Sequence, residues 1–130
     1  MSGRARGAVG VLSVVIAAVA ALGPGCAAGP GIVVPTGEDG AEVRLDDDAA
    51  AVWDATVAVA DEWGTVTAAD PEIGFVEARE GDTTVAAEVS VLESGEVRAR
   101  FRARRLGATI PDRERAQILA ENLARRLARS

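Results

Sequence analysis

Apolar and polar residues alternate through the middle of the chain, and this alternation predicts β-strands. The four expected strands cover about residues 65–69, 73–80, 83–92 and 96–105. The segments between them, 70–71, 81–82 and 93–95, contain the Asp, Pro and Gly residues that favour tight turns. Because short turns join consecutive strands antiparallel, the pattern predicts an antiparallel meander.

The turn lengths also predict how the strands pair. The expected cross-strand pairs are Val91 with Val97, Val89 with Ala99, Ala87 with Phe101, Val85 with Ala103, Ala78 with Val85 and Val76 with Ala87. Every pair is apolar on both sides, and a slip by one residue would break this agreement. We therefore expect one apolar face and one polar face on the sheet.

A helix is expected before the meander, from about Asp47 to Trp63. Asp46, Asp47 and Asp48 stand where an acidic residue can cap the first turn, and Gly64 is placed to end the helix. Its expected buried stripe contains Val52, Trp53, Thr56, Val57, Ala60 and Trp63. Both tryptophans are interpreted as core anchors rather than as ligand-binding residues.

A second helix is expected after the meander, from near Pro111 to about Ala128. Proline is favoured in a first helical turn. The expected apolar face contains Ala116, Leu119, Ala120, Leu123 and Leu127. A further short strand is expected at 42–45. Together these elements predict an α+β two-layer sandwich, in which two amphipathic helices cover one face of a four-stranded antiparallel meander.

The start of the chain has the pattern of a secretory signal peptide. Arg4 and Arg6 precede an uncharged apolar stretch of 15 residues, Ala8 to Leu22, and small residues follow up to Cys26. A membrane-spanning helix needs about 20 apolar residues, so this stretch is short for one. The alternative is an uncleaved anchor helix that continues to Val34, although a Gly-Pro-Gly segment would interrupt it.

Cys26, the one cysteine of the chain, resembles the acylated cysteine of the bacterial lipobox. Gly25 matches the small residue that precedes it, whereas Gly23 stands where leucine is usual. The resemblance implies cleavage before Cys26 and attachment of acyl groups such as palmitate, so that the membrane is a partner. The alternative is a free thiol in an oxidising compartment, which is a less common arrangement.

These features divide the chain into three expected parts. Residues 1–25 are a lipoprotein signal peptide, residues 26–40 are a lipidated Gly/Pro-rich tether, and residues 41–130 are a small globular domain. Ala27 fits the usual rule for retention in the outer membrane. We therefore expect a lipoprotein of the bacterial cell envelope that is anchored in a membrane and faces the periplasm.

Composition excludes several kinds of chemistry. All 14 basic residues are arginine, and the chain has no histidine. The usual general base, Schiff-base amine and imidazole metal ligand are therefore missing. The three consecutive aspartates, 46–48, lack the spacing of a calcium loop. We expect no catalytic residue, no metal site and no cofactor, and hence no enzyme.

Charge is unevenly distributed along the chain. Residues 26–96 contain 17 acidic and 2 basic residues, whereas residues 97–130 contain 3 acidic and 10 basic residues. The whole chain has a formal net charge of −6. This negative charge disfavours nucleic acid as a partner.

Four arginines alternate along the last expected strand and point from one face: Arg98, Arg100, Arg102 and Arg104. Phe75 shares that face. One interpretation is a solvated face, partly neutralised by Glu88 beside Arg100 and protected from edge-to-edge aggregation. The other is a patch for an anion or a protein partner, because guanidinium groups bind carboxylates and phosphates in pairs.

Two segments resemble small bacterial lipoproteins that are known only as a domain of unknown function. They are Val52–Ala55, with the sequence VWDA, and Glu77–Arg79, with the sequence EAR. The resemblance covers about residues 41–127 and implies a lipobox followed by a strand, a helix, further strands and a helix. In topology the chain is also similar to accessory lipoproteins of outer-membrane protein assembly. Neither resemblance implies an active residue.

Two functions are therefore expected as alternatives. The first is a non-enzymatic, lipid-anchored envelope protein whose domain is a structural or protein-interaction module. The second is a periplasmic binding module that recognises an anionic ligand or partner through the arginine-lined sheet face.

Overall fold

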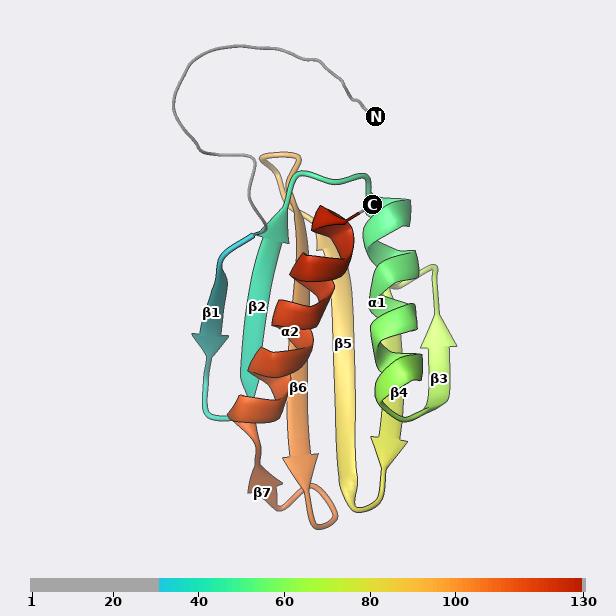
Figure 1. The fold of residues 1–130 in the computed structure, drawn as a ribbon, viewed down its shortest axis with the longest axis vertical. Helices are drawn as coiled ribbons and strands as arrows, with labels where there is room; N and C mark the ends of the chain where they lie inside the picture. Colours follow the sequence, from blue (N-terminus) through green and yellow to red (C-terminus); the bar gives the residue numbers. More distant parts are fainter. Residues whose placement is uncertain (1–30, 130) are drawn as a thin grey trace.

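The structure is a computed structural model that describes residues 31–129. One antiparallel sheet carries both helices on the same face (Figure 1). The elements are β1 (Val33–Thr36), β2 (Gly40–Leu45), α1 (Ala49–Trp63), β3 (Thr65–Asp70), β4 (Phe75–Glu80), β5 (Thr83–Val91), β6 (Val97–Arg105), β7 (Ile110–Pro111) and α2 (Arg113–Ala128). The expected signal peptide and Cys26 lie outside the described residues.

The expected α+β class is confirmed, but the sheet is larger than a four-stranded meander. Among the described residues it has seven strands, with the main order β1-β2-β6-β5-β4-β3, and β7 pairs with the end of β6. The short strand expected at 42–45 is present as β2 and begins at Gly40. β1 and β7 have 4 and 2 residues, which is too short for alternation to reveal them.

The predicted register of the meander is confirmed. β5 and β6 pair Val91 with Val97 and Ala87 with Phe101, and the other expected pairs also occur. The 2-residue and 3-residue turns therefore set the strand alignment, and the apolar pattern reinforces it.

The tether expected at 26–40 ends earlier than predicted. Val33–Thr36 forms the edge strand β1, and residues 37–39 make the turn into β2. Gly37 has a φ of +71°, in the left-handed region that glycine adopts without strain. The domain thus begins at β1 rather than at residue 41, while residues 26–30 lie outside the described part of the chain.

α1 begins two residues later than expected and ends where predicted. Asp48 occupies the N-cap position, but its side chain makes no capping hydrogen bond. The Gly64 N–H donates to the Ala60 carbonyl at 3.0 Å and closes the helix. Trp53 and Trp63 are only partly buried and pack against the core rather than within it.

α2 begins at Arg113, so the predicted start at Pro111 is wrong. Pro111 instead belongs to β7, and Asp112 is the N-cap, whose carboxylate accepts a hydrogen bond from the Arg115 N–H at 3.1 Å. The expected apolar face is confirmed. All five predicted residues, together with Ala124, are buried against the sheet and α1.

The core lies between the helices and one face of the sheet. α1 covers β3, β4 and β5, and α2 covers β1, β2 and β6. The largest fully buried side chains include Phe101, Leu119 and Leu123, and many of their neighbours are Ala or Val. Because both helices occupy the same face, the opposite face of the sheet is left open (Figure 1).

Candidate functional site

The open face of the sheet carries the four arginines predicted on β6. They alternate with the buried residues Val97, Ala99, Phe101 and Ala103, so the pleat directs them away from the helices. Phe75 lies in the same cross-strand row as Arg100, with Glu88 of β5 between them. The structure therefore brings the five predicted residues onto one surface.

Asp39 divides these arginines into two pairs. Its carboxylate oxygen Oδ2 lies 2.9 Å from Arg104 Nε and 3.6 Å from Arg102 Nε. Asp39 itself is only 9% exposed, and its carbonyl accepts a hydrogen bond from the Ala103 N–H at 2.8 Å. Arg102 and Arg104 thus hold the turn between β1 and β2 against β6, which is a structural role.

Arg98 and Arg100 are arranged differently. Among the described residues, neither side chain forms an ion pair, and Arg100 Nε is buried without a hydrogen-bond partner. Glu88 lies opposite Arg100 in the register, as predicted. Arg44 lies directly opposite Arg98, and like charges at such positions are destabilising. Glu42, on the other side of Arg100, contacts Arg44, so Arg98 is the arginine of this half best placed to accept an anionic group.

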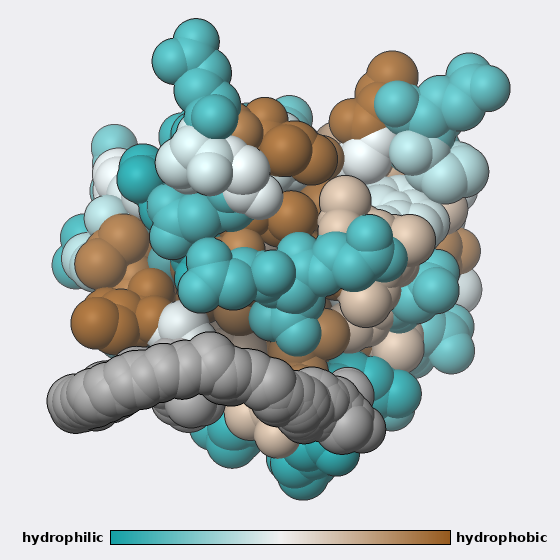
Figure 2. Space-filling model, turned by 90° about the horizontal axis from the view of Figure 1, so that it is seen from above, coloured by the Kyte–Doolittle hydropathy of each residue, from teal (hydrophilic) through white to brown (hydrophobic). Residues whose placement is uncertain are grey.

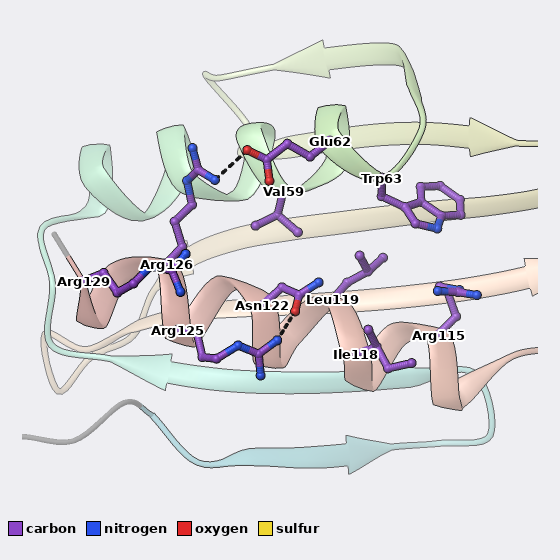
Figure 3. Close-up of a pocket in the computed structure, with 10 residues that line it drawn as sticks. All are labelled: Val59, Glu62, Trp63, Arg115, Ile118, Leu119, Asn122, Arg125, Arg126 and Arg129. Carbon is purple, nitrogen blue, oxygen red and sulfur yellow. Dashed lines mark hydrogen bonds and ion pairs between the residues drawn. The ribbon is translucent and has the colours of Figure 1, made fainter.

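A second arginine cluster lies on the other side of the molecule. It lines a groove of about 380 Å³ between α1 and α2 (Figure 3). We call this the interhelical groove, and its lining residues are Val59, Glu62, Trp63, Arg115, Ile118, Leu119, Asn122, Arg125, Arg126 and Arg129.

Two polar contacts organise the interhelical groove. Arg126 Nη1 lies 2.8 Å from Glu62 Oε2 and links the two helices. Arg125 donates a hydrogen bond to Asn122 Oδ1. The side chains of Arg115 and Arg129 make no hydrogen bond or ion pair with other residues in the described range.

Sequence reasoning missed this groove for a definable reason. The arginines near the end of α2 complement the negative end of that helix and so already have a simple explanation. Residues 115, 118, 122, 125 and 129 do recur at helical spacing and mark one stripe of α2. What the sequence does not show is that α1 lies beside that stripe.

Exposed apolar residues gather at the end of the domain where the chain enters β1. Ile32, Ile73 and Val91 are 81%, 70% and 62% exposed, the highest values among the large apolar side chains described. Ile73 and Val91 line an apolar cleft of about 570 Å³ together with Trp53. Figure 2 views this end and shows apolar atoms exposed between hydrophilic ones.

Asp47 lies at this same end, before α1. Partial desolvation raises the pKa of its carboxyl above the usual value, and the negative charge of Asp46 acts in the same direction. A backbone hydrogen bond opposes this change. The side chain still reaches solvent, so the effect of its charge on stability is screened.

Within residues 31–129, no group of three Cys, Asp or Glu side chains is arranged to hold a metal ion. In the same range, no helix is long and apolar enough to cross a membrane. Comparison of the chain with protein-family models and with curated proteins found no match in either case.

Proposed function

We propose that this chain is a lipid-anchored protein of the bacterial cell envelope, acylated at Cys26, and that its domain is a non-enzymatic interaction module. The signal-like segment 1–25 followed by the one cysteine of the chain supports the anchor. Two or more acyl chains on that cysteine provide stable membrane attachment, since each buried methylene contributes about 0.8 kcal/mol.

The short connection between Cys26 and the sheet is the observation that carries this proposal furthest. β1 begins at Val33, seven residues after Cys26. A fully extended segment of that length spans at most ~25 Å. An acylated Cys26 therefore holds the entry end of the domain close to the membrane, and the most exposed apolar side chains are at this end. A membrane-proximal position accounts for their exposure.

This orientation leaves both broad surfaces of the domain available to partners. The strands run lengthwise from the entry end (Figure 1). With that end at the membrane, the open sheet face and the helix layer would both stand upright on it. An upright sheet with one uncovered face is suited to docking a protein that lies in the same compartment.

Replacement of the cysteine tests the anchor. In cells, Cys26→Ser should move the protein from the membrane fraction to the soluble fraction, whereas Ser94→Ala, a change in the turn between β5 and β6, should leave it in the membrane. Fractionation followed by immunoblotting measures this. If the Cys26→Ser protein stays in the membrane after an alkaline carbonate wash, the uncleaved anchor helix is the better account.

The arginine-lined face is the second candidate, as a site for an anionic ligand or an acidic protein partner. Arg98 and Arg100 support it, because neither forms an ion pair among the described residues and Arg98 lies opposite Arg44. Arg102 and Arg104 support it less, because both already contact Asp39.

A charge reversal tests this face in the cell. A photoreactive residue in place of Ala86, which shares the face, should crosslink to a partner in the native envelope. Arg98→Glu with Arg100→Glu should abolish the crosslink, whereas Arg79→Glu, on the same face but on β4, should preserve it. If the double reversal leaves the crosslink unchanged, the two arginines do not bind the partner.

A further inference from the structure

We propose that the interhelical groove binds an organic phosphate, in which the phosphate contacts Arg115 in the first turn of α2 and a ring attached to it lies against Trp63. This site is separate from the expected anchor, and the sheet separates it from the open arginine-lined face.

The first argument is the uncompensated positive charge of the groove. Four arginines line it, and Glu62 is the one acidic residue among its lining side chains. Glu62 is already paired with Arg126. Arg125 and Arg129 are four residues apart on α2, a spacing at which like charges repel. This excess of positive charge attracts anions to the groove.

The second argument concerns Arg115 in the first turn of α2. A positive charge there opposes the helix dipole, whose positive end is at the N-terminus. Arg113 in the same turn donates to the Gly37 carbonyl, so the fold uses its guanidinium. The Arg115 guanidinium has no such contact among the described residues and lines the groove beside Trp63 (Figure 3). An anionic ligand in the groove would supply the negative charge that Arg115 lacks among its described neighbours.

The shape of the groove indicates more than a bare phosphate. Its volume of about 380 Å³ falls within the range of small-molecule sites. Val59 and Leu119 provide an apolar floor, and Trp63 provides an aromatic surface at one end. A phosphate group offers up to two negative charges and three acceptor oxygens, so a single guanidinium group such as that of Arg115 can bind it through two hydrogen bonds. The matching ligand class is a phosphate joined to a ring of about monosaccharide size.

Trp63 supplies a reporter for binding. The chain has two tryptophans, so Trp53→Phe leaves Trp63 as the only one. We would titrate the full chain, purified in detergent, with glucose 6-phosphate at constant ionic strength. The same chain would also be mixed with vesicles of phosphatidylinositol or of phosphatidylcholine. These arms distinguish a soluble ring phosphate from a phosphate in a lipid headgroup.

The expected result is a saturable change in Trp63 fluorescence and a rise in the unfolding temperature. Either glucose 6-phosphate or phosphatidylinositol vesicles should produce both changes. Glucose, sodium sulfate and phosphatidylcholine should not. If neither ring phosphate binds saturably, or if sulfate at equal ionic strength has the same effect, the proposal is overturned.

Paired variants separate the groove from general charge effects. Arg115→Gln with Arg125→Gln should weaken binding by about 10-fold or more, chiefly because the charge-assisted hydrogen bonds of Arg115 are lost. Arg79→Gln with Arg113→Gln removes the same charge outside the groove and should change the dissociation constant by less than about 2-fold. Equal weakening by the two double variants would overturn the proposal.

Discussion

At the scale of single residues, Asp39 joins the turn between β1 and β2 to two arginines of β6. It is nearly buried and contacts Arg102 and Arg104, which follow it by more than 60 positions in the chain. Breaking a hydrogen-bonded, partly buried charge pair leaves two guanidinium groups without their anion. Asp39 thereby fixes β1 and β2 to the meander.

We predict that Asp39→Asn lowers the free energy of unfolding by about 1–3 kcal/mol. Urea unfolding measures this change. Glu42→Gln, which weakens one 3.5 Å contact with the exposed Arg44, should cost less than about 0.5 kcal/mol. A loss at Asp39 no larger than the loss at Glu42 would show that the Asp39 contacts contribute little.

The same residue shows where sequence reasoning stops. The alternation of Arg98 to Arg104 correctly predicts that these side chains share a face. It cannot predict that Asp39 contacts two of them, because the turn that carries Asp39 meets β6 only in the folded sheet. The interhelical groove is hidden for the same reason, since Glu62 and Arg126 meet only after α1 and α2 have packed.

At the scale of elements, the two helices begin in different ways. Asp112 accepts a hydrogen bond from the first turn of α2, whereas Asp48 occupies the same position before α1 without making that bond. An N-cap side chain is worth about 1 kcal/mol only when it accepts from the exposed N–H groups of the first turn. Asp112 and Asp48 therefore allow the contribution of a capping hydrogen bond to stability to be compared within one protein.

We predict that Asp112→Ala destabilises the domain by about 1 kcal/mol and that Asp48→Ala changes its stability by less than about 0.5 kcal/mol. Chemical unfolding followed by circular dichroism measures both. Because Asp112 also lies 3.6 Å from Arg105, an Arg105→Gln variant measures how much that ion pair contributes. Equal losses at Asp112 and Asp48 would contradict the assignment of the cap.

The elements that could be predicted are those whose residues show a regular apolar pattern along the chain. The meander follows from alternation and turn length, and the apolar faces of both helices follow from their periodicity. β1 and β7 were not predicted because they are too short to show a period of two. The preference of proline for first helical turns predicts Pro111 inside the helix. In the structure, Pro111 belongs to β7 and pairs with Arg104.

At the scale of the whole molecule, the domain has one end where the chain enters and two broad faces. The helices cover one face, the arginines of β6 occupy the other, and the exposed Ile32, Ile73 and Val91 mark the entry end. The anchor proposed at Cys26, seven residues before β1, would place that end toward the membrane. The end proposed to face the membrane is therefore also the end with the most exposed apolar side chains.

We predict that the two tryptophans lie at different heights above the membrane. Trp53 lines the apolar cleft at the entry end, and Trp63 lies ten positions further along α1, or ~15 Å. In the anchored protein, lipids brominated near their headgroups should quench Trp53 in the Trp63→Phe variant more than Trp63 in the Trp53→Phe variant. Equal or reversed quenching would contradict the orientation.

Lipidation at Cys26 is most directly tested by the intact mass of protein purified from the membrane fraction. We predict a chain that begins at Cys26 and carries the added mass of two or three acyl groups, released in part by mild alkaline hydrolysis. A chain that retains residues 1–25 and carries no added lipid mass would contradict the proposed anchor.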